Sequence, residues 1–203
     1  MSDEKLDLTS KMVKWATDNI KFISIGVVIG ISMPLLWSYS QYLEEEENLV
    51  ASELYYDLID LGNSSQDTQE AHNKIIDEHE GSIYEVLAKF VLSKREFENK
   101  NYNLSKEYLE EIIDINVNDT YSSLARIKVS LIHIENKDYD MALKNLDKVT
   151  MKNSFKQIIS EIKGDIFKYK GDKEKSLEFY NEAIDASAIN NENLLMKKNS
   201  VKN

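Results

Sequence analysis

The chain has 203 residues, a net charge of -11 and no cysteine. Its length allows one domain with a core plus an appendage, and the missing cysteines exclude disulfides, catalytic thiols and thiolate metal ligands. One proline and six glycines favour an all-α fold over sandwiches or doubly wound sheets, which need frequent turn residues. The residues before Glu44 hold four lysines and four acids, so the whole negative charge lies beyond them, and a nucleic-acid-binding surface is not expected.

After a short head at residues 1–21, residues 22–43 form an uncharged run, FISIGVVIGISMPLLWSYSQYL. A hydrocarbon core about 30 Å thick needs roughly 20 helical residues, and this run supplies 22. A cleaved export signal has a shorter apolar region followed by small residues, whereas aromatic residues close this one. We therefore predict a single uncleaved transmembrane helix, with a cleaved signal and a buried core helix as the alternatives.

The residues that flank this run predict its orientation. Lysines precede the run, and neither Lys nor Arg occurs between Leu43 and Lys74, so the positive-inside rule places residues 1–21 in the cytoplasm and the C-terminal domain across the membrane. Within the run, Gly26 and Gly30 form a G-x-x-x-G pair, which allows close approach of another membrane helix. Aromatic residues mark both interfaces: Trp15, Trp37, Tyr39 and Tyr42.

Residues 44–81 are expected to form an acidic helical connector and the first helices of the following domain. Leucines recur at helical spacing on its first part: Leu49, Leu54, Leu58 and Leu61. A turn signal, Gly62-Asn-Ser-Ser-Gln, ends this element. Residues 67–80 then read as a short capped helix.

Residues 82–190 contain three self-similar blocks, at 84–112, 121–149 and 155–183. Each reads as an amphipathic helix, a polar turn and a second helix. Small residues of the second helices are 37 and 34 positions apart, and 34 residues is the period of tetratricopeptide repeats. We expect three stacked helix-turn-helix repeats in a superhelix with a concave side, followed at residues 191–203 by a polar C-terminal cap or tail.

No pattern of residues predicts catalysis or a cofactor. His72 and His79 are seven positions apart, which is the wrong spacing for a helical metal-ligand pair, and His133 stands alone. The acidic runs lack the spacing of a calcium loop. We therefore expect no enzyme, no metal and no cofactor.

The expected functional surface is the concave side, lined by residues of the first helix of each repeat. The alternative for its apolar members is burial between hairpins, because repeats need apolar residues for stacking. The candidates for partner binding are Phe90, Lys94, Ile127, Leu131, Glu161, Asp165 and Lys168.

The whole chain resembles the YfgM family of single-span, inner-membrane, tetratricopeptide-like proteins of Gram-negative bacteria. The resemblance rests on the G-V-V-I-G span running into Trp37 and on LAKFVLSKREFENKNY, ALKNLDKV and IKGDIFKYKGDKEKSLEFYNEAI. It implies an ancillary subunit of the SecYEG translocon whose periplasmic domain, with the membrane-anchored chaperone PpiD, helps pass translocated proteins to periplasmic chaperones. A general inner-membrane scaffold for another envelope complex is the alternative function.

Overall fold

The computed structural model describes residues 2–60, 73–188 and 191–202. The chain divides into two compact units, Met1–Val50 and Ala51–Asn203. The described residues form helices and no strand, so the all-α fold class expected from the sequence is confirmed.

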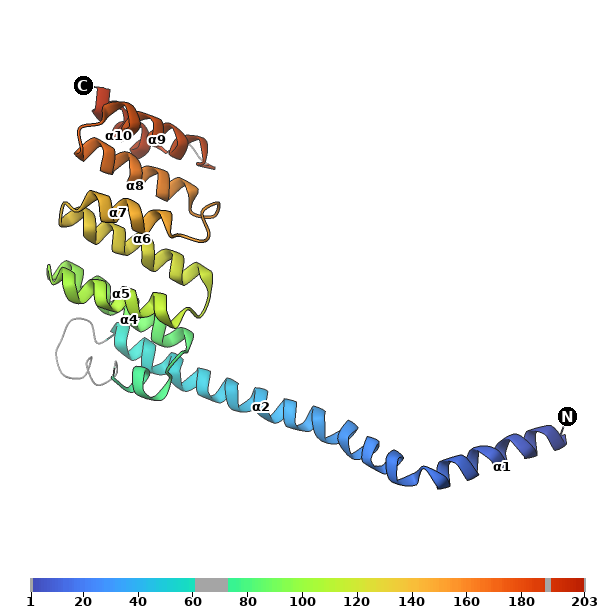
Figure 1. Cartoon of the computed structure of the whole chain (residues 1–203). Helices are drawn as coiled ribbons and strands as arrows, with labels where there is room; N and C mark the ends of the chain where they lie inside the picture. The colour runs from blue at the N-terminus through green and yellow to red at the C-terminus, as the bar shows by residue number, and fades with distance from the viewer. Residues whose placement is uncertain (1, 61–72, 189–190, 203) are drawn as a thin grey trace. The chain divides into compact units, whose positions relative to one another are not determined.

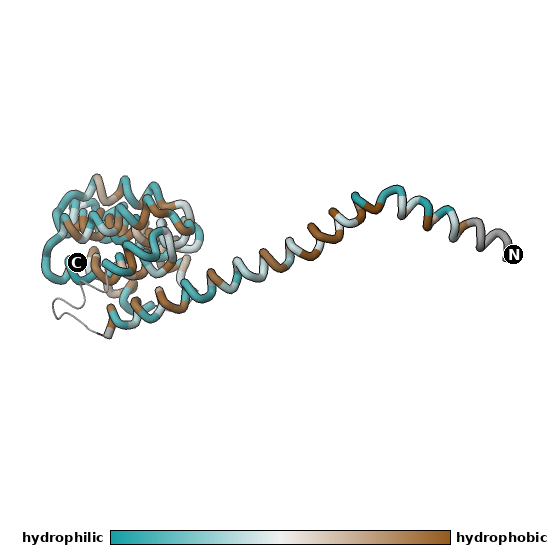
Figure 2. Tube along the Cα trace, turned by 90° about the horizontal axis from the view of Figure 1, so that it is seen from below, coloured by the Kyte–Doolittle hydropathy of each residue, from teal (hydrophilic) through white to brown (hydrophobic). Residues whose placement is uncertain are grey.

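The first unit consists of helix α1 (Ser2–Asp18) and most of the long helix α2 (Ile20–Asp60). The segment Ile20–Ile59 is long and apolar enough to cross a membrane, and none of its most apolar window is buried. Phe22 and Trp37 are 75% and 71% exposed, and Figure 2 shows the apolar residues along α2. The described part of the chain therefore offers this apolar window no core, as expected of a helix that contacts lipid.

The helix continues through Pro34, which has no amide hydrogen to donate to the preceding turn. Two residues earlier, Ser32 Oγ donates to Val28 O at 2.8 Å. This hydroxyl does not replace the bond lost at Pro34, whose helical acceptor would be Gly30 O, and membrane helices tolerate such a proline.

The second unit begins inside the last turns of α2. Ala51 and Leu58 are buried, and Leu58 packs with Ile75 of the helical segment 73–78 and with Ala88. Leu54 is partly buried against this cluster, whereas Leu49 is 65% exposed. The predicted positions Leu61, the turn at 62–66 and His72 lie outside the described residues.

Three helix hairpins follow and stack one on the next (Figure 1). The hairpins overlap the sequence blocks 84–112, 121–149 and 155–183. Their helices are α4 (Ile83–Glu98) with α5 (Tyr102–Ile115), α6 (Asp119–Glu135) with α7 (Tyr139–Asp147), and α8 (Lys156–Tyr169) with α9 (Lys173–Asp185). Helix α10 (Glu192–Lys202) packs on the last hairpin.

Small residues lie where the two helices of a hairpin cross. In the first hairpin Ser105 Oγ donates to Ser93 O at 2.7 Å, and in the third Ser176 Oγ donates to Gly164 O at 2.9 Å. A Cβ added at Gly164 would lie 2.7 Å from the Tyr180 ring, closer than packed carbon atoms approach. Glycine is therefore required at this crossing.

The turns of the three hairpins share one backbone conformation. Lys100, Lys137 and Gly171 have φ values of 62°, 60° and 78°, in the left-handed region that favours glycine. The amide of the next residue donates five residues back, as Asn101 does to Glu96 O at 2.8 Å. This pattern satisfies carbonyls at the helix end, and only the third turn adopts it with a glycine.

Candidate functional site

A pocket opens between the first hairpin and the first helix of the second. Its volume is about 130 Å³, and Lys94 and Leu131, two residues predicted from the sequence, lie on its wall. Its other lining residues are Ser93, Phe97, Ser105, Leu109, Lys128 and Ile132. Phe97 and Lys128 were not predicted from the sequence, although both lie within one helical turn of a predicted residue.

The two lysines of the pocket have few acidic neighbours. Lys94 Nζ is 3.8 Å from Glu98 Oε1, and both side chains are largely exposed. Such an exposed ion pair contributes little to the stability of the protein. Lys128 is half-buried and makes no hydrogen bond or ion pair with the residues that the structure describes. The apolar wall thus has cationic groups beside it.

Phe90 and Ile127 do not belong to an open surface. Ile127 is 1% exposed and packs in the core cluster with Ala142, Leu146 and Ile162, so its selection as a binding residue is corrected: it stabilises the stack. Phe90 is partly buried against the neighbouring core, with its ring centroid 6.4 Å from that of Tyr121.

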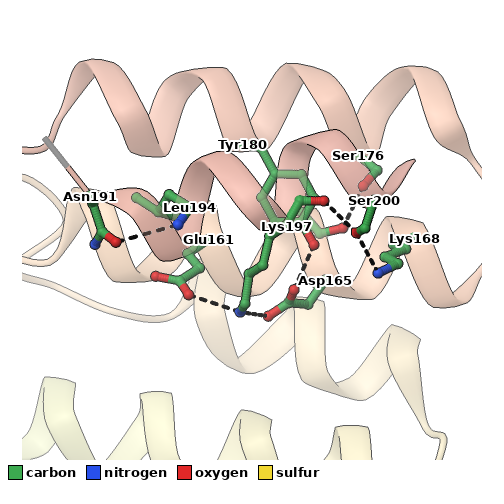
Figure 3. A network of polar contacts seen from close by, with 10 residues as sticks. Glu161, Asp165, Lys168, Ser176, Tyr180, Asn191, Leu194, Lys197 and Ser200 are labelled. Atoms are coloured by element: carbon green, nitrogen blue, oxygen red, sulfur yellow. Dashed lines mark hydrogen bonds and ion pairs between the residues drawn. The ribbon is translucent and has the colours of Figure 1, made fainter. Parts of the chain in front are cut away.

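In the third hairpin the predicted residues contact α10, with Glu161 and Asp165 half-buried and Lys168 exposed (Figure 3). Lys197 Nζ lies 2.8 Å from Glu161 Oε1 and 2.6 Å from Asp165 Oδ2. Lys168 Nζ donates to Ser200 Oγ at 2.8 Å. These contacts hold the C-terminal helix against α8, so the polar residues chosen as partner contacts have partners within the chain.

The same network includes the buried ring of Tyr180. Its hydroxyl donates to Asp165 Oδ1 at 2.6 Å, and burial, reinforced by this hydrogen bond, raises the pKa of Tyr180 well above its ordinary value of 10.0. Burial alone would lower the pKa of Lys197, but its hydrogen bonds to Asp165 and Glu161 outweigh that effect and raise it. Both shifts favour the neutral tyrosine and the charged lysine.

Gly26 and Gly30 lie on the apolar part of α2. A Cβ added at either position would meet nothing within 4 Å, so the described chain leaves this backbone surface open. A close contact there with another membrane helix stays a prediction.

The histidines within the described residues are His79 and His133. Among residues 2–60, 73–188 and 191–202, no group of three or more side chains could hold a metal ion. His133 Nδ1 lies 3.6 Å from Asp138 Oδ2 at the turn of the second hairpin. His79 Nε2 is buried without a hydrogen-bond partner in the described structure.

Comparison with protein-family models matches one described as tetratricopeptide repeat-like domain, over residues 13–203. The match includes all of α2 and the three hairpins. No curated protein matches the chain.

Proposed function

We propose, since the chain belongs to the tetratricopeptide repeat-like family, that it is a membrane-anchored scaffold beside the Sec translocon of a bacterial inner membrane. Tetratricopeptide-like domains generally mediate protein-protein interaction. In this proposal the repeat domain lies in the periplasm and helps pass translocated proteins to periplasmic chaperones. The chain holds partners together and catalyses no reaction.

The observation that carries the proposal is the extent of the family match. A single match covers both the membrane-length helix and the hairpins, which supports treating the helix and the repeats as one architecture. Stacked hairpins present an extended surface suited to binding proteins. An anchored surface of this kind concentrates its partners at the membrane.

The orientation rests on charge. Four lysines precede the apolar run and none follows until Lys74, which favours a cytoplasmic N-terminus and a periplasmic repeat domain. Since the chain has no cysteine, single cysteines placed at the exposed positions Met12 and Asn199 can be labelled from one side of the membrane. Labelling of position 199 from the cytoplasm would contradict this orientation.

The link to the translocon rests on the resemblance to the YfgM family. Mild detergent extraction of the tagged full chain should co-purify SecY and a PpiD-type chaperone. If both are absent while the protein is intact and abundant, the translocon assignment fails. Recovery of a different envelope complex in their place would favour the general scaffold.

Gly26 and Gly30 give a separate test inside the membrane. Replacing both with leucine should weaken co-purification with a translocon or chaperone membrane helix, because bulky residues prevent close backbone approach. Leucine at Val28, which lies between them, is the matched control and should leave recovery unchanged.

A further inference from the structure

The first and third hairpins correspond residue by residue through their crossings. In each, a serine hydroxyl of the second helix donates to a carbonyl twelve residues earlier, Ser105 to Ser93 and Ser176 to Gly164. Counting from these pairs, Leu109 corresponds to Tyr180 and Lys94 to Asp165. The first and third hairpins therefore share one backbone arrangement at the crossing but carry different side chains at these two positions.

In the third hairpin the space beside the crossing is filled. The Tyr180 ring lies against Gly164, its hydroxyl reaches Asp165, and Lys197 of α10 reaches the same carboxylate from outside (Figure 3). The tyrosine ring fills the apolar space, and Asp165 and Lys197 neutralise each other, so this hairpin needs no outside partner at this place.

In the first hairpin the corresponding space is open. Leucine at 109 is smaller than tyrosine, and the pocket of about 130 Å³ lies beside it. Helix α6 contributes Lys128 and Leu131 to the wall, much as α10 contributes Lys197 to the third hairpin. The first hairpin thus lacks the side chain that would fill it.

The charges differ in the same way. The third hairpin sets Asp165 against Lys197, whereas the first has Lys94 where the carboxylate would be and Lys128 beside the pocket. No carboxylate lies among the pocket's lining residues, although the chain as a whole carries a charge of -11. Lys94 has only the exposed Glu98, 3.8 Å away, as an ion-pair partner. Two cations beside an apolar pocket in an acidic protein complement a carboxylate from outside.

The volume of the pocket limits what can enter. An apolar cavity of about 150 Å³ holds one benzene molecule, so a pocket of about 130 Å³ accepts one large side chain, such as leucine or phenylalanine. A long acyl chain does not fit within it.

We propose that this pocket binds a segment of a partner protein that inserts a large aliphatic or aromatic side chain and places an adjacent Asp or Glu between Lys94 and Lys128. The inference rests on the part of the proposed function that makes the chain a protein-binding scaffold. It does not depend on the translocon being the partner.

The test uses the full chain in nanodiscs and three fluorescent peptides that differ only at a central pair of residues: Glu-Leu, Glu-Ala and Gln-Leu. Fluorescence anisotropy should show that Glu-Ala binds about tenfold or more weakly than Glu-Leu, because the buried leucine contributes most of the affinity. Gln-Leu should bind about threefold more weakly, as expected for a partly exposed ion pair.

Variants of the protein locate the effect. Lys128→Gln should weaken Glu-Leu binding about threefold and reduce the difference between Glu-Leu and Gln-Leu, since the two changes remove one interaction. Leu131→Ser should weaken the leucine peptides and leave Glu-Ala little changed. Lys144→Gln, an exposed lysine of α7, is the charge-matched control and should change nothing.

Three results would overturn the proposal. One is equal binding of all three peptides, unaffected by Lys128→Gln and Leu131→Ser. Another is displacement of Glu-Leu by a short fatty acid at lower concentration than by unlabelled peptide, which would assign the pocket to a lipid. The third is self-association of the chain that Leu131→Ser abolishes, which would assign it to a second copy. If the peptides do not bind but SecY still co-purifies, only the pocket proposal is rejected. If the peptides bind as expected but SecY does not co-purify, only the translocon assignment is rejected.

Discussion

In the α8–α9 hairpin the Tyr180 ring lies against Gly164, whereas in the α4–α5 hairpin Leu109 lies in the corresponding place and a pocket remains beside Ser93. The neighbouring helix differs too, since α10 brings a lysine to two carboxylates while α6 brings Lys128 to a surface that already carries Lys94. One crossing geometry is therefore closed at the C-terminal end of the stack and open near its beginning. Side-chain volume and charge sign decide which hairpin can accept a partner.

The largest expected effect is the difference in stability loss between truncating Tyr180 in the third hairpin and truncating Leu109 in the first. Tyr180→Ala removes a fully buried ring and should lower the free energy of unfolding by about 4 kcal/mol, as for other buried aromatic residues. Leu109→Ala should cost less, about 2.5 kcal/mol, because Leu109, although also buried, loses less apolar volume than the tyrosine ring does. Urea unfolding of the full chain in mild detergent, followed by circular dichroism, measures both, and equal losses would contradict the comparison.

Gly164→Ala should lower the free energy of unfolding by about 2 kcal/mol, because the added Cβ overlaps the Tyr180 ring. The matched test places the same change in a Tyr180→Leu background, which reproduces the leucine of the first hairpin. There the Cβ has room, and the alanine should cost nothing. A loss that persists in that background would show that the ring is not the cause.

Alkaline pH should loosen the third hairpin. The folded pKa of Tyr180 is raised above its ordinary 10.0, so its contribution to stability is complete below about pH 10 and is lost as the pH rises through the folded value. The shift of Lys197 acts in the same direction. Between about pH 8 and about pH 11 the wild type should lose about 1.5 kcal/mol more than Tyr180→Phe, the range of a charge-assisted hydrogen bond. Identical thermal unfolding profiles for the two proteins would count against the Tyr180 to Asp165 bond.

Lys197→Gln tests whether α10 is held by its ion pairs. It leaves Glu161 and Asp165 without their cation and should cost about 1 kcal/mol, a modest value because the side chain is partly exposed. Hydrogen exchange of the amides of α10 should become faster. Lys198→Gln is the adjacent control, and exchange that responds equally to both variants would exclude a specific role for Lys197.

The smallest effects concern the turns, which share a left-handed residue. Gly171→Ala should cost about 0.7 kcal/mol, the left-handed penalty less the gain from a stiffer unfolded chain. Lys137→Gly in the second turn should stabilise by about 0.5 kcal/mol, since its φ of 60° suits glycine. Thermal unfolding of both variants shows whether each is less or more stable than the wild type. Two changes in the same direction would contradict the comparison of the turns.

Much of the fold could be predicted because it depends on local spacing. The hairpins follow from helical periodicity and polar turns, and the crossing residues Gly164, Ser176 and Tyr180 follow from small and large residues four positions apart. The membrane-length helix follows from an uncharged run of sufficient length. These signals need no knowledge of how one hairpin packs on the next.

The candidate site was predicted only in part, because it depends on packing between hairpins. Lys94 and Leu131 reach the pocket, but Ile127 turns into the core, and periodicity alone does not distinguish two sides of a helix that both contact neighbours. The covering of Glu161 and Asp165 by α10 was missed because the tail is short and mostly polar. The available signal was the spacing of Lys197 and Ser200, which lie three residues apart and could face the polar side chains of α8.

Photo-crosslinking in living cells tests the central claim most directly. A photoreactive residue at Leu131, which is 38% exposed beside the pocket, is compared with one at Ile158, which is 40% exposed on α8. Position 131 should crosslink to a translocon or chaperone protein, at a peptide carrying a large apolar residue next to Asp or Glu, and position 158 should not. Equal crosslinking at both positions, or translocon crosslinks from position 158 alone, would contradict it.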